Sequence, residues 1–317
     1  MLKITLNRFS GNKSSHYSDY NYEARGNLIM NEFNNEAYRA LVTDLINDAF
    51  YLEGASRRGV IAKIRQYAEV VVRKILNLSP DDTVELGNGK LQHKIKEKNN
   101  PLLLRAVKDI NKIGSECTHT RSTRDISEDD VKNTIDRLFE LYASILIEYF
   151  KKYEFGTNPE VVYSFSMLPP IIRYITLNYL YSEYPNNLMI IDKLALVLLK
   201  ALNKDAAMTW LRERKDILEK THSVSPNAHK ANIEKYGEEI ADLLYNNAPN
   251  MYELCSERVE FVANEINKRG KLYNDFESAI VFYQKEGIVN GSSPEVKEFN
   301  SIMEFLYLGR KPQNESK

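Results

Sequence analysis

The chain has 317 residues, of which 43% are hydrophobic and 27% charged, and its formal net charge at pH 7 is −1. This length is enough for a sizeable core or for two domains, and the near-neutral charge gives no global signal for a nucleic-acid or membrane partner. Two cysteines far apart exclude a disulfide framework, and no run approaches the roughly 20 apolar residues that cross a bilayer, so we expect a cytoplasmic protein without a membrane segment.

The first segment, residues 1–34, is polar and rich in tyrosine. Its opening residues, 2–6, alternate between apolar and polar side chains, which is typical of one short strand. Apart from these, the segment carries no periodic apolar pattern. We expect an arm that packs on the body of the protein or on a partner.

From residue 35 onward, apolar residues recur every three or four positions, which predicts α-helices. Pro101 suits the first position of a helix, and Gly114 suits the residue that follows the end of one. Gly156 opens a break in the pattern, and we place a domain boundary after residue 155. The helices expected before this boundary are 35–52, 57–78, 91–97, 101–112 and 127–153.

Residues 156–317 continue the helical spacing and form the second expected domain. Two histidines, His222 and His229, lie in a polar stretch without a carboxylate or cysteine partner, so we expect no metal site there. The last residues, 309–317, are expected to form a disordered tail. The helices expected in this half are 171–181, 187–201, 206–219, 231–245, 251–268, 272–286 and 294–308. The sequence as a whole predicts an all-α fold.

Positive charge is concentrated in the first half of the chain. Residues 56–124 contain 15 Lys and Arg against 7 Asp and Glu, a net charge of +8, and the remainder of the chain cancels it. Such an asymmetry is typical of a region that contacts an anionic partner. Solvated basic helix faces give the same pattern, so both interpretations stay open.

The stretch from Lys112 to Arg124 crowds polar and titratable side chains between two expected helices. Its centre is His119, with Lys112, Glu116, Arg121 and Arg124 nearby. A histidine among cations suits RNA strand scission without a metal. The imidazole takes the 2′-OH proton or protonates the leaving oxygen, and a cation stabilises the extra charge on phosphorus. A structural histidine at a helix end gives the same local pattern.

Two further pairs of residues frame this stretch. Ser127 and Asp130 have the spacing of a capping box and predict the start of the next helix. Arg65 and Glu69 are four residues apart on an earlier expected helix, so they share one face and can form an ion pair. That pair either supports the helix surface or faces the His119 stretch.

Residues 50–150 resemble a HEPN domain (the higher-eukaryote and prokaryote nucleotide-binding family), in particular the branch found in prokaryotic defence and abortive-infection proteins. Three pieces in the right order carry the resemblance. Arg65-Gln-Tyr-Ala-Glu69 looks like the Arg and Glu of the early helix in that branch. Ile110-Asn-Lys-Ile-Gly-Ser-Glu-Cys-Thr-His119 is similar to its Arg-x-x-Gly-Asn-x-x-x-His stretch, and Asp125-Ile-Ser-Glu-Asp-Asp130 resembles the opening of its final long helix.

The resemblance implies a bundle of four or five helices that dimerises and brings two Arg-plus-His motifs face to face. Catalytic members of the family are endoribonucleases that need no metal or other cofactor. In this chain His119 fits the histidine of the motif, while Lys112, preceded by Asn111, stands where the family has Arg. Ser115 stands where the branch often has Asn. A lysine supplies charge but not the two-pronged hydrogen bonding of arginine.

Two hypotheses follow for function. The first is a HEPN-type metal-independent endoribonuclease that acts in prokaryotic antiphage defence or as a toxin, with His119, Lys112 and Asn111 as catalytic residues. The second is a catalytically inactive HEPN module that binds RNA, a nucleotide or a partner protein. We expect RNA and a second copy of the chain as partners, and residues 156–317 to bind a partner protein or a phage trigger. The residues expected to contact the substrate are Arg121, Arg124, Glu116, Arg65 and Glu69.

Overall fold

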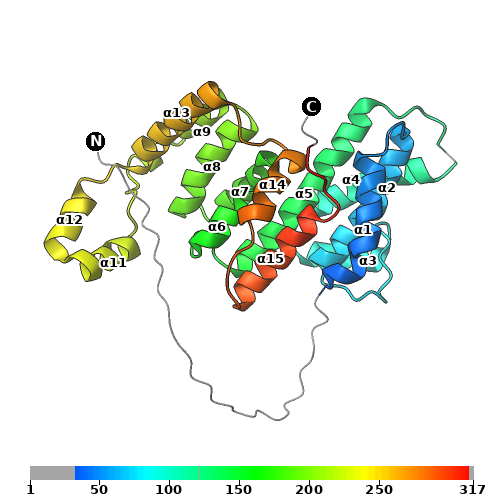
Figure 1. The fold of residues 1–317 in the computed structure, drawn as a ribbon, viewed down its shortest axis with the longest axis horizontal. Coiled ribbons are helices and arrows are strands. Elements are labelled where there is room, and N and C mark those ends of the chain that lie inside the picture. The colour runs from blue at the N-terminus through cyan, green and yellow to red at the C-terminus, as the bar shows by residue number, and fades with distance from the viewer. Residues whose placement is uncertain (1–32, 121, 314–317) are drawn as a thin grey trace, which may run out of the picture. The chain divides into compact units, whose positions relative to one another are not determined.

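The computed structural model describes residues 33–120 and 122–313, and within these ranges the chain forms fifteen α-helices and no β-strand (Figure 1). This confirms the all-α prediction. The expected strand at residues 2–6, and the expected arm up to residue 32, lie outside the described residues. The helices are α1 (Asn35–Phe50), α2 (Arg57–Ile75), α3 (Gly89–Glu97), α4 (Pro101–Thr118), α5 (Glu128–Lys152), α6 (Pro159–Phe165), α7 (Pro170–Glu183), α8 (Leu188–Ala201), α9 (Lys204–Arg212), α10 (Lys215–Leu218), α11 (Pro226–Tyr236), α12 (Glu238–Asn246), α13 (Met251–Arg269), α14 (Phe276–Glu286) and α15 (Pro294–Tyr307).

Most helices begin where a short polar side chain caps the first turn. An Asn, Ser or Asp accepts a hydrogen bond from a backbone N–H at the start of every described helix except α7, α10 and α12. These residue types satisfy N–H groups that have no partner within the helix. Pro101 occupies the first position of α4, as its position in the sequence predicts. None of the described helices is long and apolar enough to cross a membrane.

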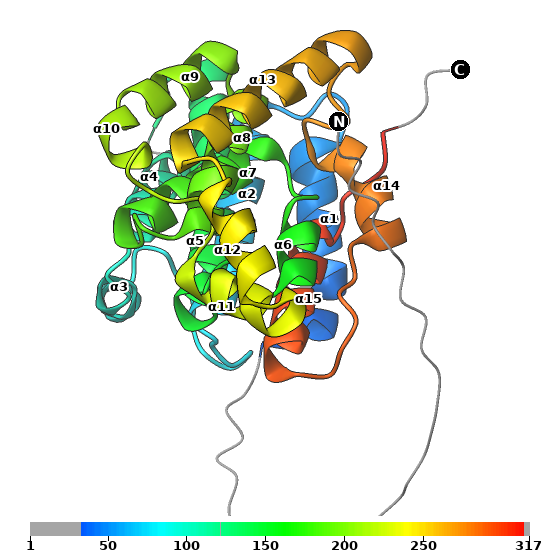
Figure 2. The same cartoon turned by 90° about the vertical axis from the view of Figure 1, so that its left-hand side faces the viewer.

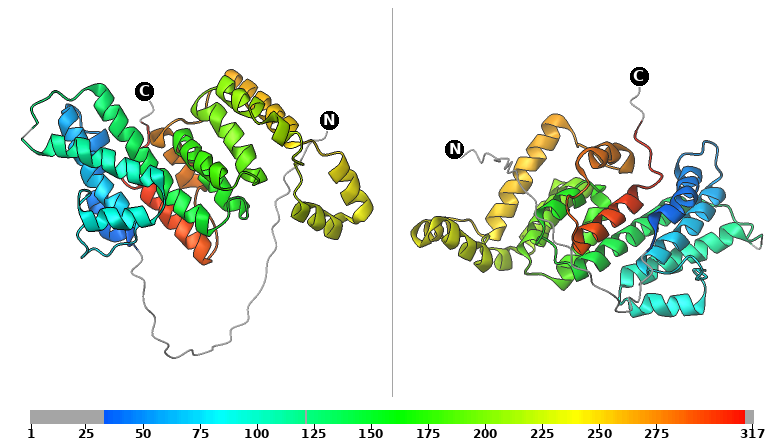
Figure 3. Two further views of the ribbon diagram at one scale, coloured as in Figure 1. Left: turned by 180° about the vertical axis from the view of Figure 1, so that it is seen from behind. Right: turned by 60° about the horizontal axis from the view of Figure 1, so that its bottom comes forward.

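One hydrophobic core extends across the predicted domain boundary at residue 155. The central helix α5 packs against α2 and α4 on one side and against α7 on the other. Near the end of the chain, α15 returns to contact α5, α1 and α6 (Figure 1, Figure 3). Buried side chains from both halves belong to a single cluster. The break at Gly156 is therefore a turn within one packed unit, because α5 buries apolar side chains on two faces.

In the C-terminal half, α8 packs against α7, α9 and α13 (Figure 2). The single helix expected at 231–245 is instead two helices, α11 and α12, separated by Gly237. Gly237 has a φ of +84°, a conformation that glycine adopts without the steric cost of a side chain. The helix expected at 206–219 is likewise divided into α9 and α10.

The predicted disordered tail is wrong for residues 309–313. Arg310 is buried, its Nη2 donates to the Tyr142 hydroxyl at 3.0 Å, and its guanidinium lies 4.3 Å from the ring centroid of Phe276. The backbone N–H of Gln313 donates to the carbonyl oxygen of Glu277 at 2.9 Å. The polar composition of this segment gave no sign that it is packed. An arginine can nevertheless be buried when its guanidinium lies over aromatic rings.

Gly114 does not end its helix, contrary to the sequence prediction. Helix α4 continues to Thr118, and His119 is its C-cap residue. Gly114 is buried where α2 crosses α4, and a Cβ atom placed on it would lie 2.3 Å from Cδ of Arg65 and 2.7 Å from its Cβ. The glycine therefore permits the close approach of the two helices.

We predict that Gly114→Ala destabilises the protein although alanine has the higher helix propensity. The added methyl group overlaps the Arg65 side chain, and overpacking of this kind costs about 1–3 kcal/mol. Chemical denaturation of the two proteins measures the difference. Gly89→Ala is the matched control, because no atom lies within 4 Å of a Cβ at that helical position. A Gly114→Ala protein as stable as the parent would contradict the close packing.

Candidate functional site

Two arginines at the start of α2 hold the segment between α4 and α5. Arg58 donates from Nη1 to the carbonyl oxygen of Glu116 at 2.6 Å and from Nη2 to that of Arg124 at 2.9 Å. Arg57 forms a 2.8 Å ion pair with Glu128. The guanidinium groups of Arg57 and Arg58 thus have structural partners both before and after His119 in the chain. The end of α4 and the start of α5 are fixed relative to α2 by these bonds.

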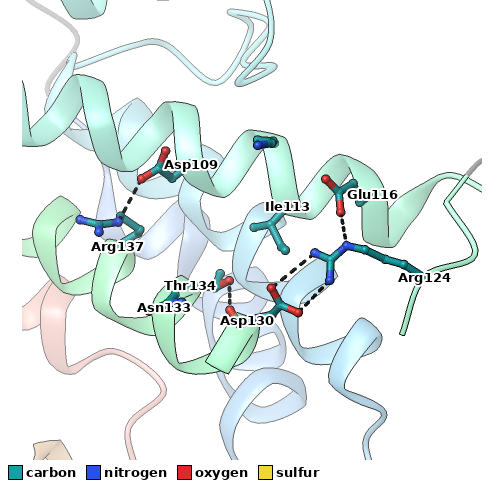
Figure 4. Close-up of a pocket in the computed structure, with 9 residues that line it drawn as sticks. Asp109, Ile113, Glu116, Arg124, Asp130, Asn133, Thr134 and Arg137 are labelled. Carbon is teal, nitrogen blue, oxygen red and sulfur yellow. Dashed lines mark hydrogen bonds and ion pairs between the residues drawn. The ribbon is translucent and has the colours of Figure 1, made fainter. Parts of the chain in front are cut away.

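Arg124 lies between two carboxylates (Figure 4). Its Nε is 2.8 Å from Oε2 of Glu116, and its Nη1 is 2.8 Å from Oδ2 of Asp130. The hydrogen bonds from Arg124 and Ser127 hold the pKa of the Asp130 carboxyl well below its usual range. The predicted capping box of Ser127 and Asp130 is confirmed. Because two anions neutralise it, the Arg124 guanidinium is a poor phosphate-binding group in this arrangement.

A pocket of about 520 Å³ lies between α4 and α5. Its charged lining is balanced: three carboxylates, including Asp109, oppose three cations. Arg137 pairs with Asp109 at 3.1 Å (Figure 4). It also pairs with the buried Glu140. Lys112 also lines the pocket and forms no ion pair or hydrogen bond among the described residues. The lining residues are Asp109, Lys112, Ile113, Glu116, Arg124, Asp130, Asn133, Thr134 and Arg137.

Three of the predicted site residues lie instead where α2 meets α4. Nη1 of Arg65 is 3.4 Å from Oε1 of Glu69, which confirms the predicted ion pair, and Nη2 of Arg65 is 3.4 Å from Oδ1 of Asn111. Burial raises the pKa of the Glu69 carboxyl, and the Arg65 charge opposes that shift. Arg65, Glu69 and Asn111 do not line the pocket that Lys112 and Glu116 share.

His119 lies at the C-terminal end of α4 with its side chain exposed. Its backbone N–H donates to the carbonyl oxygen of Ser115 at 3.1 Å, and its imidazole makes no hydrogen bond or ion pair within the described part of the chain. Lys112 is seven positions earlier, about 10 Å away along the axis of α4. His119 itself follows the last helical residue and has an extended backbone conformation. The fifth candidate of the stretch, Arg121, lies outside the described residues.

Sequence reasoning missed the clamp formed by Arg57 and Arg58 and the ion pair of Asp109 with Arg137. The doublet of arginines directly after the α2 cap is a signal for the first. The second joins side chains on the consecutive helices α4 and α5, and it depends on how these two helices pack, which no local spacing predicts. Within residues 33–120 and 122–313, no group of three or more His, Cys, Asp or Glu side chains is placed to hold a metal ion. No protein-family model, curated protein or solved structure matches this chain.

We predict that Ser127→Ala lowers the free energy of unfolding by about 1 kcal/mol, because the first turn of α5 loses its side-chain cap. Chemical denaturation of both proteins measures this loss. Thr123→Ala, an exposed substitution in the same connection, is the control and should be neutral. Equal losses in both variants would show that the capping box does not hold this junction.

Proposed function

We propose that this chain is a metal-independent endoribonuclease of the HEPN kind, with His119 as the proton-transfer residue and Lys112 as the phosphate-binding cation. The observation that carries the proposal is the availability of these two side chains. Lys112 on α4 and His119 at the C-cap of α4 are both exposed and unpartnered among the described residues. By contrast, the guanidinium groups of Arg58 and Arg124 are held by carbonyl and carboxylate oxygens. The resemblance of residues 50–150 to HEPN domains points to the same two positions.

The chemistry requires one proton acceptor, one proton donor and a cation. A neutral imidazole takes the proton of an RNA 2′-OH, and the resulting oxygen forms a bond to the adjacent phosphorus. The bond from phosphorus to the 5′-oxygen breaks, and that oxygen receives a proton from an imidazolium. The products are a 2′,3′-cyclic phosphate and a 5′-hydroxyl end. Lys112 Nζ, placed beside the phosphate, stabilises the negative charge that develops on its oxygens.

A single His119 cannot be base and acid in the same step, so we propose that the active form is a dimer in which two His119 residues share one cleft. The biological setting we propose is prokaryotic defence or toxin activity. Residues 156–313 would then receive the signal from a partner protein or phage trigger. These parts of the proposal rest on the family resemblance and on the need for two imidazoles.

We expect the purified chain to cleave mixed RNA and tRNA in the presence of EDTA. His119→Ala should lower the rate by about 10²-fold or more, because it removes the proton-transfer group. Lys112→Ala should lower the rate by roughly tenfold, the effect of one charge-assisted contact. Arg124→Ala should have a smaller effect, since its charge is already neutralised.

The matched control is His93→Gln, because His93 is an exposed histidine of α3 that faces Glu97 at 3.2 Å. It should cleave at the parental rate. Analysis of the RNA ends checks the chemistry, since a 3′-hydroxyl and a 5′-phosphate would contradict attack by the 2′-oxygen. Cleavage by His119→Ala at the parental rate would contradict the proposed role of His119.

A second candidate function is an RNA- or nucleotide-binding module without catalysis. Two observations weigh against catalysis and so favour this candidate. Asn111 bonds to Arg65 at the α2–α4 contact, away from His119, and Arg124 is neutralised by two carboxylates. This candidate predicts that RNA binding weakens as salt rises, that Lys112→Ala reduces the salt dependence, and that no RNA is cut.

A further inference from the structure

A second group of positive charges lines a small pocket between α6, α7 and α8. The pocket has a volume of about 80 Å³, far below the roughly 300–1,000 Å³ of a site for a drug-sized ligand. Helices α7 and α8 pack side by side here (Figure 1). Three of the lining residues are cations, and no carboxylate is among them. The lining residues are Val162, Phe165, Ser166, Arg173, Leu177, Lys193, Leu196, Val197 and Lys200.

Arg173 is the most enclosed of the three cations. Only 6% of its surface is exposed, and its Nε has no hydrogen-bond partner among the described residues. Its guanidinium carbon lies 5.8 Å from the centroid of the Tyr273 ring, a contact that leaves the charge uncompensated. Burial lowers the pKa of Arg173, and the groups that act against this shift are tyrosines. A guanidinium held this way is costly to bury unless an anion accompanies it.

Lys200 adds a second uncompensated charge. Burial, followed by the charges of Arg173 and Lys193, lowers the pKa of Lys200 to about 8. Lys193 has an anionic neighbour, Asp192, at 3.5 Å, but Asp192 is also bound at 2.7 Å by Arg258. The positive charge of the three lining cations is therefore only partly neutralised by neighbouring carboxylates.

We propose that this pocket binds a phosphoryl group, either as free phosphate or as the phosphate of a phosphate monoester. Three converging cations match a group that carries about two negative charges near pH 7. A carboxylate brings only one. The volume of about 80 Å³ admits a single such group rather than a whole cofactor. Arg173 supplies fixed planar donors, and Lys193 and Lys200 supply point charges on flexible stems.

The experiment is isothermal titration calorimetry of the full chain with inorganic phosphate, adenosine monophosphate and acetate, each at constant ionic strength. We expect saturable binding of phosphate, and tighter binding of the monoester would assign the site to an organic ligand. Lys200→Gln and Arg173→Gln should each weaken phosphate binding about tenfold or more. Lys230→Gln, which changes an exposed lysine of α11, is the matched control and should bind like the parent.

Three results would overturn the proposal. Phosphate heats that do not saturate would show the absence of a defined site. Parental affinity in Lys200→Gln would show that phosphate binds elsewhere, and this variant decides the matter if Arg173→Gln fails to fold. Acetate binding as tight as that of phosphate would show that the pocket selects a carboxylate. None of these measurements depends on cleavage of RNA.

Discussion

The close crossing of α2 over α4 at Gly114 is the constraint on which the candidate site depends. Because Gly114 has no side chain, the Arg65 stem lies directly on the α4 backbone. This contact fixes the rotation of α4 about its own axis. It directs Asn111 toward Arg65 on α2 and leaves Lys112 to line the pocket beside α5. A different rotation of α4 would change which polar residues of the motif face one another.

Much of the fold follows from local patterns in the sequence. Apolar residues at helical spacing predict nearly all the long helices, and the Ser127–Asp130 capping box fixes the start of α5. Two of the failures, at Gly114 and at Arg310, have a common cause. The local sequence predicts a helix end at Gly114, but the glycine accommodates a crossing helix. It likewise predicts a disordered tail at Arg310, but the Arg310 guanidinium packs over aromatic rings. Contacts between residues far apart in sequence decide both cases.

The candidate site shows the same division between local and long-range information. The sequence groups His119 with every nearby charge as one constellation. The structure divides that group: Arg124 is neutralised between Glu116 and Asp130, while Asn111 belongs to the contact with α2. Composition predicts how many cations are present but not which ones are already paired. Of the described members of that group, Lys112 and His119 remain unpaired, a smaller feature than the +8 charge of residues 56–124 suggests.

The central proposal is that RNA binds this protein at the C-terminal end of α4. The most direct test replaces His119 with a photoreactive benzophenone side chain, which removes the proposed proton transfer and so preserves the RNA, and irradiates the protein with labelled RNA. The account predicts a cross-link at position 119 that unlabelled RNA competes away. The same side chain at the exposed position of Lys297 on α15 should give little cross-linking. Equal cross-linking at both positions, or none at 119, would contradict the account.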